Sequence, residues 1–371
     1  MKENMRVVIV TNIASPYRIP TWGEVAKRVE RLTVLLCNEM DSNRIWKLPE
    51  STEFEIKVLK GKSIYLNKFD TGFYLNRSIL SDLIRLKPEA IVLGGYESPT
   101  YLMTIIYARL TKTPLILWWG SHALSQHIRN PLFSFIKQKI FRYFDAFVTY
   151  GSLASESLAQ NGVSRGKIVT SVNTVNTSIF FNDGSRHKSG AIRFLFVGQL
   201  IDRKGILDLV DAFKDIENAE LYIIGHGELE LQVNRLISKM PNIHYIGKTG
   251  SESTLAEYYR KFDCLVVPSK REVWGLVVNE AMLSGLPVIA SDRVGAAYDL
   301  VLRAPTFAGL IYEHSSKDSL INSIELVKNL YREGKIANSE IAEWASRFSP
   351  EGYAEDIIRA INIAKNHDAK S

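Results

Sequence analysis

Two glutamates in the segment 264–301 have a spacing that suits the recognition of hydroxyl groups. Glu272 stands in a charged loop, and Glu280 follows eight positions later on a helix that we expect from Gly275 to about Ser284. With a helical rise of about 1.5 Å per residue, Glu280 would lie roughly 8 Å from the helix start. Two carboxylates so placed can reach hydroxyl groups on two rings of one ligand, such as a sugar and a ribose.

The neighbours of Glu280 argue against a solvated surface charge. The residues that flank it on the expected helix are apolar: Val277, Val278, Ala281 and Met282. Burying a carboxylate without a partner is costly, so we expect Glu280 to have a hydrogen-bonding partner.

Two adjacent cations, Arg203 and Lys204, stand between a strand that ends at Val197 and a helix that begins near Gly205. The free N–H groups and the dipole of a helix N-terminus favour an anion at this place. Two cations beside them would form a clamp for a diphosphate. A pair of solvated loop charges fits the same residues, and the spacing alone leaves both interpretations open.

Glycines and histidines follow other expected strands. Gly225 and Gly227 flank His226 but do not complete the G-x-G-x-x-G pattern, and the first loop of the chain, TNIASPYRIP, lacks it too. This argues against a NAD or FAD enzyme. The two glycines permit a tight turn or a close approach of the backbone to a ligand. His122 also follows an expected strand, and the sequence fits a site residue and a structural histidine equally well.

The elements that must position these residues are short apolar runs alternating with helical patterns. Continuous apolar runs are typical of buried parallel strands, which need helical crossovers, so we expect an α/β chain with doubly wound sheets. The alternation pauses at 173–190 and then resumes, which predicts two successive Rossmann-like domains. The expected strands are 7–11, 32–37, 54–59, 90–93, 115–119, 146–149, 168–170, 193–197, 219–224, 243–246, 264–267 and 287–290; expected helices include 19–31, 76–86, 100–110 and two within 338–364, divided at Ser349-Pro350.

The motifs of the second half together resemble the retaining glycosyltransferases of family 4, which have the GT-B fold. Glu272 and Glu280 match the E-x7-E motif of that family. The segments VGQLIDRKG, IIGHGE, PSKREVWGLVVNEAMLSGLPVIAS and Gly309-Leu310-Ile311 recur in the family's order, and the similarity covers most of 192–315. It implies two Rossmann-like domains facing a cleft: an acceptor-side domain at 1–175, a linker at 176–190, a nucleotide-sugar domain at 191–348, and a C-terminal helix at 349–371 that packs back toward the first domain.

The resemblance also implies a role for each matching residue. Glu280 would bond the ribose hydroxyls of a nucleotide sugar, Glu272 would contact the donor sugar, and Lys204 with Arg203 would hold the diphosphate. The remaining expected donor contacts are His122, the backbone near Trp274, Gly275 and Leu276, and the glycines Gly198, Gly225 and Gly227. Many members have Gly-Arg-Leu where this chain has Gly198-Gln199-Leu200, so Arg203 is the candidate to replace that cation.

The implied activity is a retaining transfer of a hexose-type sugar from a nucleotide diphosphate donor, with a UDP-sugar favoured. The acceptor would be a glycan or a lipid-linked molecule in cell-surface polysaccharide or lipopolysaccharide synthesis. Two other interpretations are a GT-B-like sugar-nucleotide epimerase and a basic nucleic-acid-binding protein. The sequence has no RNP-like, helix-turn-helix or zinc module, so we expect no nucleic-acid partner.

The charge is unevenly distributed along the chain. The net charge is 46 − 40 = +6, with 23 − 14 = +9 in residues 1–181 and 23 − 26 = −3 in the rest. This asymmetry suggests that the first half faces an anionic partner. We expect a cytoplasmic protein without a membrane span, peripheral on the inner face of the membrane. An expected helix over 132–144 would set Ile136, Ile140 and Tyr143 or Phe144 against the core, and its Lys137, Lys139 and Arg142 against either solvent or anionic lipid.

The composition suits a two-domain globular enzyme. The chain has 371 residues, of which 46% are hydrophobic and 23% charged, and single cores stop growing at about 250–300 residues. Cys37 and Cys264 each lie in an apolar run and are expected to be buried thiols rather than a disulfide. No Asp-x-Asp pair and no Cys/His cluster of ligand spacing occurs, so we expect neither a metal nor another cofactor.

Overall fold

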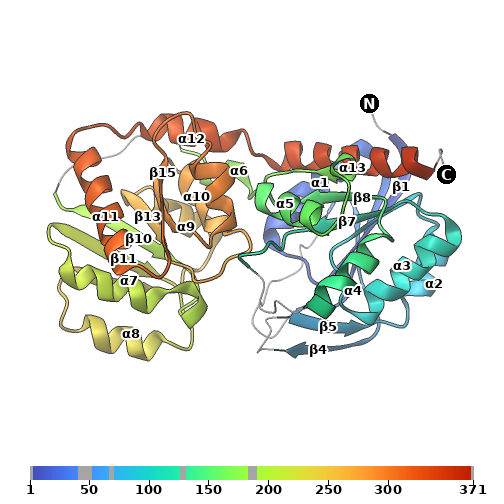
Figure 1. The fold of residues 1–371 in the computed structure, drawn as a ribbon, viewed down its shortest axis with the longest axis horizontal. Coiled ribbons are helices and arrows are strands. Elements are labelled where there is room, and N and C mark those ends of the chain that lie inside the picture. The colour runs from blue at the N-terminus through green and yellow to red at the C-terminus, as the bar shows by residue number, and fades with distance from the viewer. Residues whose placement is uncertain (1–2, 41–51, 67–70, 126–130, 183–189, 369–371) are drawn as a thin grey trace. The chain divides into compact units, whose positions relative to one another are not determined.

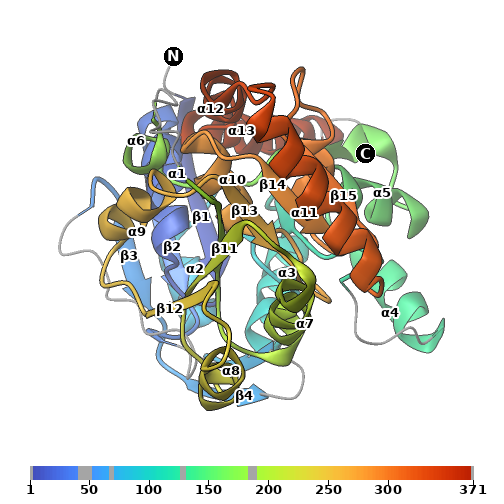
Figure 2. The ribbon, with the colours of Figure 1, turned by 90° about the vertical axis from the view of Figure 1, so that its left-hand side faces the viewer.

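The chain forms two units that each surround a parallel β-sheet (Figures 1 and 2). The computed structural model describes residues 3–40, 52–66, 71–125, 131–182 and 190–368. Unit 1 combines Met1–Ser121 and Gln126–Val172 with Pro350–Ser371, and unit 2 contains His122–Ser125 and Asn173–Ser349. The expected boundaries at 175 and 349 thus lie within a few residues of the divisions of the structure, and the short segment at 122–125 joins unit 2 instead of unit 1.

The sheet of unit 1 has seven parallel strands in the order β3-β2-β1-β6-β7-β8-β9. All residues of β6 and β7 are apolar and buried, as expected for parallel strands covered on both faces. A separate antiparallel pair, β4 with β5, lies outside this sheet. The bounds are β1 (Glu3–Thr11), β2 (Val29–Leu36), β3 (Glu55–Val58), β4 (Lys62–Leu66), β5 (Thr71–Leu75), β6 (Ala90–Leu93), β7 (Leu115–Trp119), β8 (Ala146–Thr149) and β9 (Ile168–Val169).

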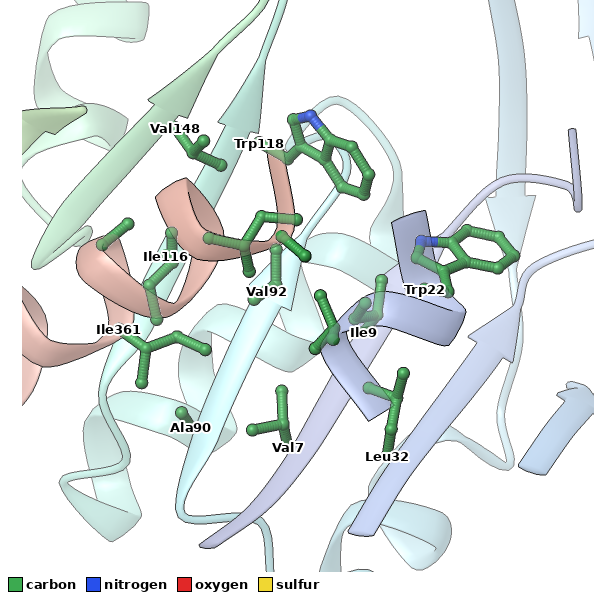
Figure 3. Packing of buried hydrophobic residues seen from close by; sticks show 14 of the residues in the cluster. Val7, Ile9, Trp22, Leu32, Ala90, Val92, Ile116, Trp118, Val148 and Ile361 are labelled. Atoms are coloured by element: carbon green, nitrogen blue, oxygen red, sulfur yellow. The ribbon is translucent and has the colours of Figure 1, made fainter. Parts of the chain in front are cut away.

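Two helices from opposite ends of the chain cover one face of this sheet: α1 (Ile19–Arg28) and α13 (Pro350–Asp368). The buried residues of α13 recur at helical spacing and form one apolar stripe: Tyr353, Ala354, Ile357, Ala360, Ile361 and Ala364. Figure 3 shows Ile361 of α13 and Trp22 of α1 beside residues of the sheet such as Ile9 and Val92. The C-terminal helix therefore completes the core of unit 1.

The opposite face of the sheet is covered by α2 (Ile79–Leu86), α3 (Pro99–Thr111), α4 (Pro131–Phe141) and α5 (Ser152–Gln160). In α4 the core contact comes from Phe141, whose ring centroid lies 5.4 Å from that of Trp119. Phe144, just beyond the helix, packs on Phe147, and Ile140 is partly buried.

Part of the core face expected for the α4 segment is wrong. Ile136 is 45% exposed, because Phe141 takes the core position instead. Of the two expected alternatives at the end of the segment, Phe144 is buried and Tyr143 is 50% exposed. Asn130 and the side chain of Phe133 lie outside the described residues.

Two other expectations for unit 1 need correction. The helix expected over 19–31 ends at Arg28, because Val29 already pairs with Glu3 of β1 and is fully buried in the sheet. The pair β4–β5 was not expected, since its residues do not form a continuous apolar run, and Ile64, Phe73 and Leu75 are exposed.

Unit 2 repeats the architecture with six parallel strands in the order β12-β11-β10-β13-β14-β15. The strands are β10 (Ile192–Val197), β11 (Ala219–Ile224), β12 (Ile243–Gly247), β13 (Cys264–Val267), β14 (Val288–Ser291) and β15 (Gly309–Tyr312). The helices are α6 (Thr177–Phe180), α7 (Ile206–Ala212), α8 (Glu230–Ile237), α9 (Glu252–Tyr259), α10 (Leu276–Leu283), α11 (Lys317–Arg332) and α12 (Asn338–Ser346). The short helix α6 lies inside the segment expected as a linker, and β15 forms from the Gly309-Leu310-Ile311 motif, which was not expected to be a strand.

Each sheet has a point where the direction of its crossovers reverses. In unit 1, β1 pairs with β2 on one side and β6 on the other, and in unit 2, β10 pairs with β11 and β13 in the same way. In open α/β sheets, ligands bind beyond the carboxyl ends of the strands at such a switch point. A ligand is therefore expected at the loops after β1, β6, β10 and β13.

Candidate functional site

The cation pair expected at a helix mouth lies at the switch point of unit 2. Arg203 and Lys204 end a single helical turn, Asp202–Lys204, and Gly205, with φ of 70°, directly precedes α7. A Cβ on Gly205 would lie 1.9 Å from the carbonyl oxygen of Pro268, at the end of β13. Only a glycine allows this approach, which sets both cations against the loop that follows β13.

The carboxylate of Glu272 lies on these two cations. Oε2 of Glu272 accepts a hydrogen bond from Nζ of Lys204 and lies 3.7 Å from a guanidinium nitrogen of Arg203. Burial alone would raise the pKa of Glu272, but the charges of Lys204 and Arg203 outweigh it and hold the pKa below the usual value. The structure thus brings together three residues that are separated by up to 69 positions in the chain.

The backbone of this loop is fixed by a second set of contacts. The amide of Glu272 donates to the carbonyl of Arg293 at 3.2 Å, and the amide of Ala296 donates to the carbonyl of Trp274 at 2.9 Å. The Oγ of Ser291 donates to the carbonyl of Ser269 at 2.5 Å. The loop after β14 therefore supports the loop that carries Glu272.

His122 contacts the same loop through its ring. Its Nε2 lies 3.0 Å from the carbonyl oxygen of Val273 and 3.2 Å from that of Glu272, which makes Nε2 the protonated nitrogen that donates to both. The residue is 2% exposed, and burial lowers its pKa despite the two carbonyls, which raise it. Its Nδ1 is buried and has no hydrogen-bond partner within the described part of the chain. His122 thus supports the backbone that carries Glu272.

Helix α10 begins where the sequence predicts it. Gly275 has φ of 97° and precedes the helix, whose first N–H groups have no intrahelical acceptor. The side chain of Trp274 faces the interior, where its indole N–H donates to Oδ1 of Asn279 at 2.8 Å. What Trp274, Gly275 and Leu276 can offer a ligand is therefore their backbone rather than the indole ring.

Glu280 has a hydrogen-bonding partner, as expected, and the structure identifies it as Tyr259 at the end of α9. The phenol of Tyr259 donates to Oε2 of Glu280 at 2.8 Å, and Glu280 is 1% exposed. Burial raises the pKa of Glu280 to about 7, while the bond from Tyr259 lowers it and the charge of Glu252 raises it. A carboxyl group with this pKa loses its proton near neutral pH.

The glycines of the β10 and β11 loops serve the packing of backbone on backbone. A Cβ on Gly225 would lie 1.8 Å from the carbonyl oxygen of Gly198, and one on Gly227 would lie 2.5 Å from that of Leu200. The amide of Leu200 donates to the carbonyl of His226 at 2.8 Å. These close approaches are between two loops of unit 2, and they shape the loop that leads to Arg203 and Lys204.

Sequence reasoning missed the residues beneath this site. Ser269, Ser291 and Tyr259 are buried hydroxyl residues whose bonds hold Glu272 or Glu280 in place. Arg293 and the neighbouring His314 are also joined, with Nε of Arg293 3.0 Å from Nδ1 of His314. The apolar segment at 309–312 could have indicated His314, because this segment forms β15 and His314 follows the end of that strand.

Other expectations concern metals, thiols and membrane spans. Within the described ranges, no group of three or more His, Cys, Asp or Glu side chains is placed to hold a metal ion. Cys37 and Cys264 are buried and do not form a disulfide, as expected. Among the helices that the structure describes, none combines the length and apolar character needed to cross a membrane.

Comparison with known proteins identifies the family. Residues 179–344 match the model of the glycosyl transferases group 1. The uncharacterized glycosyltransferase MJ1178 of Methanocaldococcus jannaschii is 32% identical over 308 residues, which span 79% of each chain. Anabaena Alr3699/HepE, solved in complex with UDP and glucose, has a TM-score of 0.72 at 15% identity, covering 97% of this chain and 100% of that one. The lipopolysaccharide outer core galactosyltransferase WaaB has a TM-score of 0.70 at 16% identity, covering 96% and 99%.

These likenesses agree with the two Rossmann-like units described above and assign them to the GT-B fold. The relative from Methanocaldococcus jannaschii extends over most of both chains, so the relationship is not confined to one unit. The chain belongs to the glycosyl transferases group 1 family.

Proposed function

We propose that the protein is a retaining, metal-independent glycosyltransferase of family 4 type. It moves a hexose-type sugar from a nucleotide diphosphate sugar, with UDP favoured, to a hydroxyl group of a glycan or lipid-linked acceptor. The acceptor belongs to the synthesis of cell-surface polysaccharide or lipopolysaccharide.

One observation carries this proposal: Lys204 and Arg203 meet Glu272 at the switch point of unit 2. In the proposed complex the two cations hold the diphosphate, and Glu272 bonds hydroxyl groups of the donor sugar. Glu280, with its pKa near 7, bonds the ribose. The N–H groups before and within the first turn of α10 add the partial positive charge of a helix N-terminus.

The chemistry assigned to these groups is electrostatic. The bond from the anomeric carbon to the diphosphate oxygen breaks, and a bond from that carbon to the acceptor oxygen forms on the same face. The bond electrons leave with the diphosphate, which takes the acceptor's proton. Negative charge grows on the leaving group, so fixed cations stabilise the transition state more than the ground state.

Two related proteins support the choice of donor and pathway. HepE was solved with UDP and glucose, and WaaB is a lipopolysaccharide galactosyltransferase. Both share the fold of this chain.

The test of the proposal is a panel of nucleotide sugars. A ligand that binds only the folded state raises the unfolding temperature, so UDP-sugars should stabilise the protein more than GDP- or ADP-sugars. The stabilising donor is then incubated with the protein alone and with glycan or lipid acceptors. Conversion of the donor without an acceptor would show an epimerase instead, and no stabilisation by any nucleotide sugar would refute the donor site.

We expect EDTA to leave the transfer activity largely unchanged. The reason is that Lys204 and Arg203 supply the positive charge for which many phosphate sites use Mg²⁺. The measurement is the transfer rate after dialysis against EDTA, with and without added Mg²⁺ or Mn²⁺. Complete inhibition that Mg²⁺ reverses would contradict the metal-independent part of the proposal.

We further propose that unit 1 associates with an anionic lipid surface. The outer sides of α2 and α3 are apolar, with Ile84, Ile106 and Leu110 exposed by 62%, 57% and 81%. The two helices contact each other, since Tyr107 donates to the carbonyl of Leu83 at 3.1 Å.

The charged residues of these two helices are mostly cations. Their only acidic residue, Asp82, is buried and paired, whereas the cations exposed on or beside them are Arg77, Arg85, Lys87 and Lys112. Apolar residues ringed by cations suit an anionic bilayer surface.

Helix α4 adds a smaller surface of the same kind. Phe135 is 56% exposed, and Nζ of Lys139 lies 5.2 Å from its ring centroid. Lys137 is a poorer candidate for lipid contact because its ammonium group lies 5.9 Å from the ring centroids of both Trp119 and Phe141. Burial accordingly lowers the pKa of Lys137.

Vesicle sedimentation should show binding to anionic vesicles that fades with salt. Changing Lys139 and Arg142 to Gln should weaken it roughly 10- to 30-fold, at about 1 kcal/mol per cation near the surface. The matched control changes two exposed lysines of unit 2, Lys239 and Lys248, to Gln and should bind as the wild type does. Equal binding to neutral and anionic vesicles, or binding to neither, would remove the membrane proposal and favour a soluble acceptor.

A further inference from the structure

Arg18 occupies the switch point of unit 1 in a fixed position. It ends the single turn Pro16–Arg18, directly after the loop that follows β1. One guanidinium nitrogen donates to Oγ1 of Thr11 at 2.6 Å, and another donates to the phenol oxygen of Tyr150 at 2.8 Å. The guanidinium carbon lies 5.1 Å from the ring centroid of Trp118. The three contacts thus come from the carboxyl ends of β1 and β7 and from the residue that follows β8.

The partners of Arg18 are themselves held in place. Thr11 is fully buried, and Trp118 is 4% exposed and donates its indole N–H to the phenol of Tyr353 on α13. The phenol of Tyr353 in turn donates to the carbonyl of Thr149 at 3.1 Å. A side chain that is held at this many points has lost most of its rotamer freedom. The guanidinium of Arg18 is therefore preorganised to bind a ligand.

Within the described part of the chain, no carboxylate forms an ion pair with Arg18. Its contacts are two neutral hydroxyl groups and an aromatic face, and the side chain is only partly exposed. Charged groups that leave water are usually paired. A guanidinium also has more N–H donors than these two bonds use.

Two glycines pack closely against the residues that hold Arg18. A Cβ on Gly94, after β6, would lie 2.9 Å from Oγ1 of Thr11, and one on Gly120, after β7, would lie 2.2 Å from the ring of Tyr150. Both loops therefore approach the partners of Arg18 as backbone alone. The carboxylate of Glu97, in the loop after β6, is exposed and accepts the N–H of Tyr96 at 3.0 Å.

We propose that Arg18 is the anion-binding group of an acceptor subsite, and that the acceptor carries a phosphate. The acceptor role of this subsite rests on the proposed function. The binding of an anion at Arg18 does not depend on that function and can be tested separately. The fork of a guanidinium matches the oxygens of a phosphate, and its position at the switch point is where a ligand of unit 1 belongs. The source of the phosphate is either a soluble phosphorylated sugar or a lipid-borne phosphate.

The experiment follows the indole N–H signal of Trp118 by NMR, assigned with Trp118→Phe, because this ring lies under the guanidinium. Inorganic phosphate is the soluble probe, and dodecyl phosphate in neutral detergent micelles is the lipid-borne one. We expect at least one probe to shift the signal in a saturable way. Arg18→Met should weaken that binding at least tenfold. Arg18→Lys keeps the charge without the fork of the guanidinium, and its affinity should lie between those of the wild type and Arg18→Met.

The matched control is Arg165→Met, which removes an exposed arginine of unit 1 with 73% side-chain exposure. It should bind both probes as the wild type does. A response to dodecyl phosphate alone, or a tighter binding of it than of inorganic phosphate, assigns a lipid-borne phosphate, and equal or tighter binding of inorganic phosphate assigns a soluble one. Wild-type binding by Arg18→Met, an equal loss in Arg165→Met, or no shift with either probe would overturn the proposal.

Donor binding separates this test from that of the proposed function. Arg18→Met should be stabilised by a nucleotide sugar as much as the wild type, since the donor residues lie in unit 2. If no nucleotide sugar raised the unfolding temperature of the wild type, the donor site would be refuted. The result for phosphate binding at Arg18 would still stand.

Discussion

Glu280→Ala is expected to weaken nucleotide-sugar binding roughly 10- to 150-fold while the protein stays folded. The carboxylate is 1% exposed on α10 and has the phenol of Tyr259 as a partner. In the proposed complex it also bonds the ribose, and losing a hydrogen bond to a charged group costs about 1.5–3 kcal/mol. Calorimetric titration with the donor measures the change, and circular dichroism checks the fold.

A matched control is available on the neighbouring helix. Glu257 is exposed on α9, so Glu257→Ala removes an equal charge without touching the site and should keep wild-type affinity. If Glu280→Ala bound the donor as tightly as the wild type, its role as the ribose ligand would be wrong.

The same carboxyl group should give donor binding a pH dependence centred near 7. Burial raises the pKa of Glu280 to about 7, and its ionised form accepts hydroxyl bonds better than its protonated form. Donor affinity should therefore rise as the pH increases through this value, and Glu280→Gln should abolish the rise. Tyr259→Phe should move the midpoint to higher pH, because the phenol's bond lowers the pKa of Glu280.

The stability of the protein should respond to pH in the opposite direction. The folded state holds a proton on Glu280 above the ordinary value of 4.5, where the unfolded chain has already lost it. The contribution of this group to stability is therefore full below about 4.5 and declines as the pH rises through about 7. Comparing donor affinity with unfolding temperature across this range separates the two effects.

The sequence predicted the strands well where local composition decides them. The residues expected for β6, β7, β8, β11 and β13 are those found, because each is a short buried run bounded by polar residues or turns. It failed where pairing decides the structure. Val29 is strand because β1 lies beside it, and β15 is a four-residue edge strand whose first three residues are only partly buried.

The candidate site shows the same division. Glu272, Glu280, Arg203 and Lys204 could be picked from their residue types and from the helices that follow them. The contacts of Glu272 with Arg203 and Lys204 could not, because they arise only when β10 pairs with β13 through Phe194 and Cys264. Tyr259 and Arg18 were not predicted, for a related reason. Each makes at least one contact with a residue 21 or more positions away, and nothing in the local sequence pattern distinguishes them.

In the proposed mechanism, the contact between Lys204 and Glu272 affects the rate of transfer. Lys204 is held by a carboxylate that also lies 3.7 Å from Arg203, so its ammonium group is positioned before a donor binds. A cation fixed in advance costs no reorganisation when charge develops on the leaving diphosphate. Its contribution should therefore appear in turnover more than in donor affinity.

Lys204→Ala is accordingly expected to lower kcat by about 10²–10³-fold, the effect of removing one preorganised donor at a developing oxyanion. Donor affinity should fall much less, because Arg203 and the α10 amides still hold the diphosphate. The measurement is the initial rate at saturating donor, with calorimetric titration for affinity. Lys214→Ala, which removes a half-exposed lysine paired with Asp211 in the same unit, is the matched control and should keep wild-type kinetics. A Lys204→Ala enzyme with weakened donor binding and undiminished turnover at saturation would show that Lys204 only binds the donor and does not assist the departure of the diphosphate.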